Sequence, residues 1–175
     1  MVSARVARSC AVPSIAVDLR GSAIGQIRLE PGFDARVSMA VRPVIHGRKP
    51  VLRQMEGPAG ISLIAAVHSE LGKRNLYCEG TPPLLFTENM TNMERLFKKR
   101  NRSPYVKDGI NNYLVEGREG AVNPQKKGTK AAAHYRLKIK PGKAAVIRLR
   151  LAEAPTARKG RKTKGSESSF GPDFD

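Results

Sequence analysis

Proline and glycine recur so often along this chain that long helices are excluded, and this spacing constrains the fold most. The 175 residues include 16 glycines and 12 prolines. Proline removes a backbone donor and glycine favours turns, so both tend to end helices and strands. Short apolar stretches with a turn signal every 8–12 residues or so are typical of β-sandwiches. We therefore expect a mainly β protein, an incomplete antiparallel β-sandwich.

The clearest buried strand is expected at residues 61–67. This run, ISLIAAV, is apolar and includes β-branched residues, and it is bounded by Gly57, Pro58 and Gly60 in front and by Gly72 behind. Further strands are expected at residues 75–79, 84–87 and 112–115, and one or two helical turns at residues 93–99.

Residues 134–151 predict a β-hairpin. Apolar and basic residues alternate on both sides of Pro141 and Gly142, a pair suited to the two central positions of a turn. One face of this hairpin would be apolar and the other basic. The basic face would carry Arg136, Lys138, Lys140, Arg148 and Arg150, with His134 as an ordinary surface residue.

The chain divides into three parts by composition. Residues 1–50 are irregular, apart from a short strand near 40–44, and their bias toward Arg, Ala, Val, Gly and Pro resembles out-of-frame translation of GC-rich DNA. Residues 51–152 hold the strand signals and form the partial sandwich. Residues 153–175 are rich in Lys, Arg, Gly and Ser with little to bury, which predicts a flexible basic linker.

The charge distribution raises nucleic acid as a partner. The formal net charge is +17, and residues 126–164 contain 14 lysines and arginines but a single acidic residue, Glu153. The five basic residues of the predicted hairpin are therefore candidates for polyanion binding. A solvated face is the favoured interpretation, because no aromatic side chains alternate with these cations to stack on bases.

Familiar catalytic and metal-binding motifs are absent from the sequence. Two cysteines, Cys10 and Cys78, make no disulfide framework and no C-x-x-C pair, and the three histidines lie far apart. No cofactor and no metal are expected. No stretch approaches the 18 or so apolar residues of a membrane-spanning helix, so we expect no membrane partner. With no secretory signal recognised, a cytoplasmic location is expected.

Four blocks between residues 76 and 137 resemble a known enzyme family. They are LYCEG (76–80), LLFTENMTNMERLF (84–97), NRSPYVKDGINNYLV (101–115) and NPQKKGTKAAAHYRL (123–137), followed by FGPDFD (170–175). Together they resemble the N-terminal domain of the bacterial branch of glycoside hydrolase family 63, which includes processing glucosidases. The chain departs from that family in having no tryptophan and in the basic triplet at residues 98–100.

The resemblance implies a non-catalytic β-sandwich that precedes an (α/α)6 barrel carrying the catalytic carboxylates. The barrel would follow residue 175, so no residue of this chain is expected to be catalytic. The partner would be that barrel, and a carbohydrate substrate would be met only through it. A small nucleic-acid-binding protein is the alternative, and a carbohydrate-binding module is a third, which the lack of tryptophan disfavours.

Within the third block, four polar residues have two interpretations. Lys107, Asp108, Asn111 and Asn112 are candidates for contacts with sugar or with a neighbouring domain. Turn chemistry is the favoured interpretation, because Asp-Gly and Asn-Asn pairs suit the backbone of turns.

Overall fold

The computed structural model describes residues 49–155, except positions 71, 139, 141 and 142, together with the backbone of residues 14–18, 23–29 and 34–42. The predicted basic linker lies outside the described residues, apart from residues 153–155. Short strands and helices follow one another, as the turn spacing predicts. The strands are β1 (Ser14–Asp18), β2 (Ala23–Leu29), β3 (Asp34–Arg42), β4 (Val51–Met55), β5 (Ile61–His68), β6 (Gly72–Glu79), β7 (Leu84–Thr87), β8 (Lys127–Gly128), β9 (Lys130–Lys138) and β10 (Ala145–Glu153). The helices are α1 (Met93–Phe97), α2 (Gly109–Glu116) and the 3₁₀ turn η1 (Glu119–Ala121).

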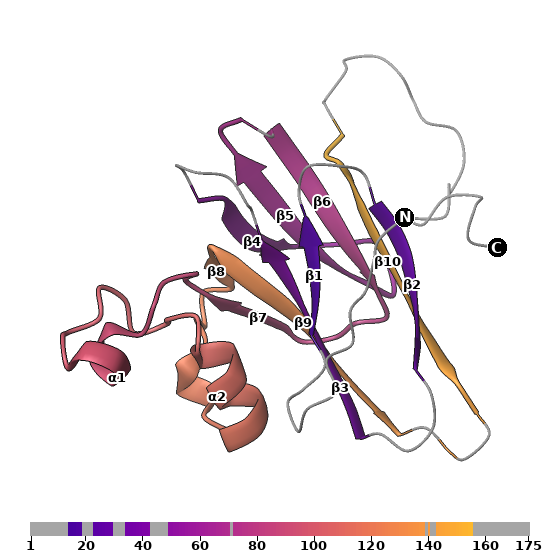
Figure 1. Cartoon of the computed structure of the whole chain (residues 1–175). Coiled ribbons are helices and arrows are strands. Elements are labelled where there is room, and N and C mark those ends of the chain that lie inside the picture. Colours follow the sequence, from indigo (N-terminus) through magenta and orange to yellow (C-terminus); the bar gives the residue numbers. More distant parts are fainter. Residues whose placement is uncertain are drawn as a thin grey trace.

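Two sheets build the molecule, which is mainly β as expected. One has the strand order β1-β3-β9-β7 and the other β2-β10-β6-β5-β4-β8, and neighbouring strands are antiparallel except for the parallel pair β1 and β3 (Figure 1). The first 42 residues, to which the sequence assigned almost no fold, supply three of these strands. β2 pairs with β10 and β3 pairs with β9, so both sheets contain strands from both ends of the chain.

The sheets pack face to face around one core. Every second residue of a strand points to the same face, so alternate residues of β4, β5, β6, β7, β9 and β10 meet between the sheets. The largest buried side chains of this core are Leu52, Ile64, Leu76, Phe86 and Leu151. On β9 small residues, Ala131 and Ala133, occupy the corresponding inward positions. Their small volume offsets the bulk of the side chains from the facing sheet.

The predicted hairpin is wrong. β9 pairs with β3 and β7, whereas β10 pairs with β2 and β6, so the two strands lie in different sheets (Figure 1). The predicted turn does close, because the Lys143 N–H donates to the Lys140 carbonyl at 3.1 Å; Pro141 and Gly142 themselves lie outside the described residues. Alternation of apolar and polar residues reports which face of a strand is buried but not which strand lies beside it. A hairpin closed by Pro141 and Gly142 would pair Leu137 with Val146 and Tyr135 with Arg148. The apolar residues of the two strands would then point to opposite faces, whereas in the observed arrangement both apolar sets reach the core.

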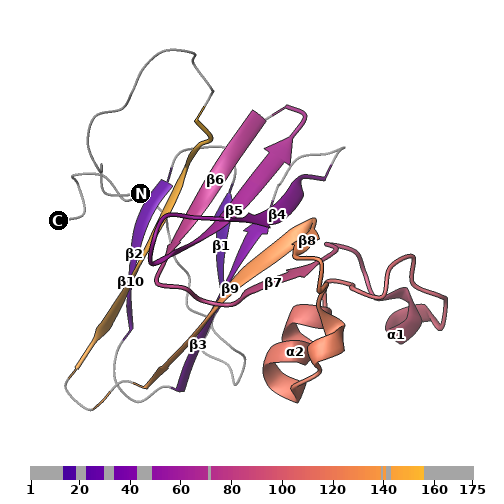
Figure 2. The same ribbon diagram turned by 180° about the vertical axis from the view of Figure 1, so that it is seen from behind.

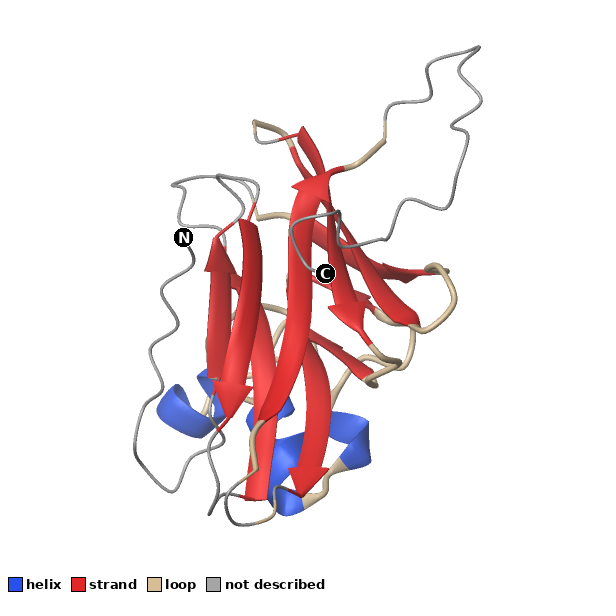
Figure 3. Cartoon of the chain, turned by 90° about the vertical axis from the view of Figure 1, so that its right-hand side faces the viewer, coloured by secondary structure: helices blue, strands red, loops and turns tan. Residues whose placement is uncertain are grey.

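A helical excursion connects β7 to β9 and lies at one end of the strands (Figures 2 and 3). Residues 112–115, expected as a strand, are part of helix α2. Ile110 and Leu114 of this helix pack on Leu85 and Ala132, which are paired on β7 and β9. Helix α2 therefore covers the outer face of β7 and β9. Its buried residues 110 and 114 are four positions apart, which places them on one face of a helix.

Candidate binding surfaces

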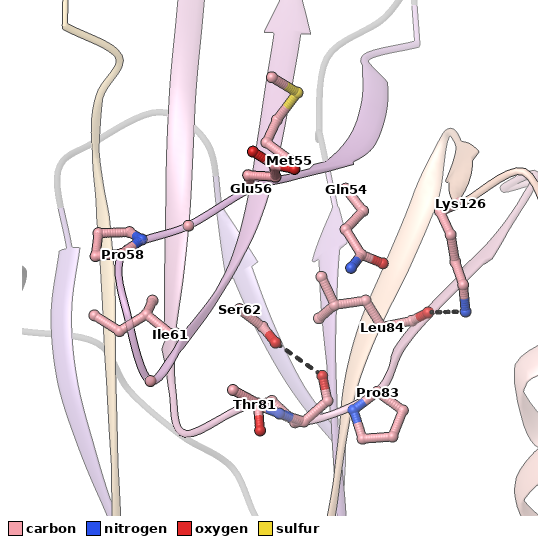
Figure 4. Close-up of a pocket in the computed structure, with 13 residues that line it drawn as sticks. Gln54, Met55, Glu56, Pro58, Ile61, Ser62, Thr81, Pro83, Leu84 and Lys126 are labelled. Atoms are coloured by element: carbon pink, nitrogen blue, oxygen red, sulfur yellow. Dashed lines mark hydrogen bonds between the residues drawn. The ribbon is translucent and has the colours of Figure 1, made fainter.

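The described residues contain no catalytic constellation and no group of three potential metal ligands. They form an open groove of about 870 Å³ between the β4–β5 turn and the β6–β7 connection (Figure 4). Glu56 and Lys126 are the charged residues among its described lining. The Lys126 Nζ donates to the Leu84 carbonyl at 3.2 Å, and the Ser62 hydroxyl donates to the Pro82 carbonyl at 3.0 Å. The Lys126 and Ser62 side chains therefore bind backbone carbonyls and do not form an acid–base pair with each other.

The predicted basic face is divided between two surfaces. Arg136 and Lys138 point away from the core on β9, whereas Arg148 and Arg150 point away from it on β10, in the other sheet. Lys140 is exposed in the connection between them. Because the two sheets face each other, their outer surfaces look in opposite directions. Binding of a polyanion by these residues stays a prediction, but not as one continuous stripe.

Arg148 and His134 contact neighbours that the sequence did not predict. The Arg148 guanidinium lies 3.1 Å from the Glu79 carboxylate, whose other oxygen accepts from the Arg148 backbone N–H at 2.8 Å. His134, expected at the surface, is half-buried, and its ring meets Tyr113 edge-to-face with 6.4 Å between ring centroids. Helix α2 carries Tyr113, so the same helix that covers β7 and β9 also covers His134.

The four polar candidates of the third block lie at and within helix α2. Lys107 is exposed just before the helix, and its backbone N–H donates to the Met90 carbonyl at 3.0 Å. Asp108 occupies the N-cap position, and its carboxylate lies 3.2 Å from the Arg95 guanidinium. Asn111 and Asn112 are helical, so turn chemistry is the wrong interpretation for these two. Their role at a domain interface stays a prediction.

A first candidate surface, which sequence reasoning missed, is the outer face of β4, β5 and β6. We define the outer strip as Val51, Met55, Leu63, Ala65, Val67 and Tyr77. Val51 pairs with Val67, and Leu63 pairs with Met55 and Tyr77, whereas Ala65 pairs with the polar residues Arg53 and Asn75. Val51, Met55 and Val67 are 50%, 46% and 44% exposed. Neither described core cluster extends over them. The signal was present, because β5 is apolar at almost every position on both faces.

A second candidate surface is the segment around α1, which we define as the α1 loop, residues 92–102. Leu96 and Phe97 are 52% and 57% exposed in it. Helix α1 lies farther from the sheets than α2 does (Figures 1 and 2). Four exposed cations follow these two apolar residues: Lys98, Lys99, Arg100 and Arg102. The sequence marks this surface directly, as the run LFKKRNR.

Comparison with known proteins corrects the expected family. No protein-family model matches the chain, and no solved structure matches it. The chain is similar to the uncharacterized protein YMR196W of Saccharomyces cerevisiae, with 46% identity over 76 residues, which are 42% of this chain and 7% of that protein. The expected membership of glycoside hydrolase family 63, its glucosidase activity and a bacterial origin are contradicted by this eukaryotic, uncharacterized relative. The chain spans a small part of the length of the curated relative that it matches.

No helix among the described residues is long and apolar enough to cross a membrane.

Proposed function

We propose that this chain is a non-catalytic β-sandwich module that docks onto another protein domain through the outer strip. The observation that carries the proposal is the double-sided apolar character of β5. Its inward residues Ile64 and Ala66 are in the core, while Leu63, Ala65 and Val67 face outward. In antiparallel sheets with one wet face, outward positions are usually polar. A strand that is apolar on both faces is typical of a sheet covered on both faces.

The second sheet of the same molecule supports this interpretation. Its outward residues Leu85 and Ala132 are also apolar, and helix α2 covers them. The outer strip also carries apolar residues, of which Val51, Met55 and Val67 are about half exposed while Leu63 is buried. Large exposed apolar patches on soluble proteins commonly mark interaction sites. We infer that the cover of the outer strip is supplied by another polypeptide domain.

The length of the yeast relative favours a protein domain as the occupant. The similar segment is 7% of that protein, so most of it lies outside the match and is available to pack on such a module. The surface has mixed chemistry, since Arg53 lies between Val51 and Met55 on β4 and Lys73 pairs with Val67. Protein–protein interfaces also combine apolar and polar residues. We further propose that the module acts in the cytoplasm, which the free, buried thiol of Cys78 supports.

The proposal is tested by the reactivity of a thiol placed on the strip. Val67→Cys, in a chain with Cys10→Ser and Cys78→Ala, should react quickly with a maleimide when purified, because this position is exposed. In an extract of the cell that produces the protein, the same thiol should react at least about tenfold more slowly, since burial protects thiols from reagents. Glu119→Cys, exposed on η1, is the control and should react at the same rate in both samples. Equal rates for Val67→Cys in both samples would contradict docking.

A further inference from the structure

The α1 loop has a fixed shape, although it projects away from the sheets. The Asn92 side chain caps helix α1 by accepting from the Arg95 N–H at 3.0 Å. The Asn101 side-chain oxygen accepts from the Met93 N–H at 2.8 Å, and its amide donates to Asn92 at 3.1 Å. The start of the helix and the far end of the loop are therefore tied to each other. A loop that is ordered before binding loses less conformational entropy when a ligand arrives.

Charge on this loop is strongly one-sided. Arg95 forms an ion pair with Asp108, but Lys98, Lys99, Arg100 and Arg102 form none with a described residue. Glu94 is the acidic residue of the loop. Four exposed cations within five positions attract phosphates. Phe97, directly before them, offers an exposed aromatic face.

These features favour one class of ligand over two others. Lysine is depleted at the cores of protein–protein interfaces, which disfavours an acidic protein as the partner of Lys98 and Lys99. Helices that lie on membranes have a long apolar face, and five-residue α1 offers two exposed apolar side chains. Cations around an exposed aromatic ring are instead the chemistry of proteins that bind single strands, where phosphates meet the cations and a base stacks on the ring.

We propose that the α1 loop binds single-stranded nucleic acid, with Phe97 as the stacking platform and Lys98, Lys99, Arg100 and Arg102 as phosphate contacts. This site is separate from the outer strip and does not depend on the docking proposal. It differs from the predicted hairpin face in the exposure of its aromatic ring: Phe97 is 57% exposed, whereas Tyr77, which pairs with Arg150, is only partly exposed. A stacked base must be unpaired, so the site should prefer single strands to duplex.

The test measures binding of the full chain to a fluorescein-labelled oligothymidylate and to a duplex of the same length. Phe97→Ala should weaken single-strand binding about 5- to 150-fold, the range found when a stacking residue is removed. Phe97→Leu should lose most of the affinity as well, whereas Phe97→Trp should keep it. Lys99→Gln and Arg100→Gln should each lower the slope of log affinity against log salt concentration by about 0.7. Lys73→Gln, on the other side of the core, is the control and should leave both quantities unchanged.

Three results would overturn the site. Equal affinity of Phe97→Ala and the unaltered chain would show charge attraction alone, and so would equal binding of duplex and single strand. Loss of all binding when residues 155–164 are deleted would place binding in the basic tail. Tighter binding to phosphatidylserine vesicles than to the oligonucleotide, again dependent on Phe97, would identify a membrane ligand instead. Because residue 97 is highly exposed, thermal melting of each variant should match that of the unaltered chain, which separates binding from folding.

Discussion

A single buried thiol shows how strongly the sandwich excludes water. Cys78 is fully buried on β6, beside Leu149 of β10 and Ser62 of β5. Burial raises the pKa of its thiol to about 12. Burial also raises the pKa of Tyr135, with smaller contributions from the charges of Cys78 and Glu79. Tyr135 donates its hydroxyl to the Glu79 carbonyl at 2.8 Å, so both groups favour their protonated forms in the folded protein.

Stability should therefore decline in alkaline solution. The thiol holds its proton more tightly in the folded chain than in the unfolded chain, where its pKa is 9.0. Its contribution is complete below pH 9 and is lost as the pH rises toward 12, at up to about 1.4 kcal/mol per pH unit. Urea unfolding at a series of pH values should show this decline. In Cys78→Ala the decline should be shallower, with only the tyrosine contribution remaining. Identical slopes in both proteins would disprove the burial of the thiol.

At the scale of elements, local patterns predicted strands well and partners poorly. Residues 61–67, 75–79 and 84–87 all lie in strands, since apolar runs bounded by turn residues need only local information. Residues 112–115 were mistaken for a strand. The helix there depends on Ile110 and Leu114 meeting Leu85 and Ala132, contacts between segments far apart in the sequence.

The candidate surfaces were not predicted for the same reason, because they depend on contacts between segments far apart in the sequence. The sequence supplied the basic residues of β9 and β10, but their division between two outer faces follows from pairing with β2 and β3. Those partners lie in the first 42 residues, where no periodicity marks them. The outer strip was also missed. The apolar character of β5 is visible in the sequence, but the exposure of Val51, Met55 and Val67 is a property of the fold.

Disulfide trapping distinguishes the observed strand arrangement from a hairpin. In a chain with Cys10→Ser and Cys78→Ala, cysteines at Asn75 and Ala152, paired across β6 and β10, should form a disulfide on mild oxidation. Cysteines at Arg136 and Ile147 should not, because these residues lie away from the turn on strands of different sheets, and packed sheets are about 10 Å apart. In a hairpin around residues 141 and 142 the same two residues would face each other. A disulfide between positions 136 and 147, measured by mass spectrometry, would refute the arrangement.

The whole molecule is a sandwich with unlike outer faces. Helix α2 covers β7 and β9 of one sheet, and the other sheet presents Val51, Met55 and Val67 of the outer strip at the surface. The α1 loop adds a basic, apolar projection at the helical end. Neither surface contains an acid–base pair or a metal-ligand cluster among the described residues. We propose that both surfaces are binding surfaces, the sheet face for a protein domain and the loop for single-stranded nucleic acid.

Photo-crosslinking from the outer strip tests the central claim most directly. A photoreactive phenylalanine analogue is placed at position 67 of the protein expressed in its native cell. On irradiation it should yield one defined product that joins residue 67 to a polypeptide segment outside these 175 residues. Val51→Lys should abolish that product, because Val51 is paired with Val67 across β4 and β5. The same group at position 119 should not yield it. A product made only of copies of this chain, or no protein product at position 67, would contradict docking onto another domain.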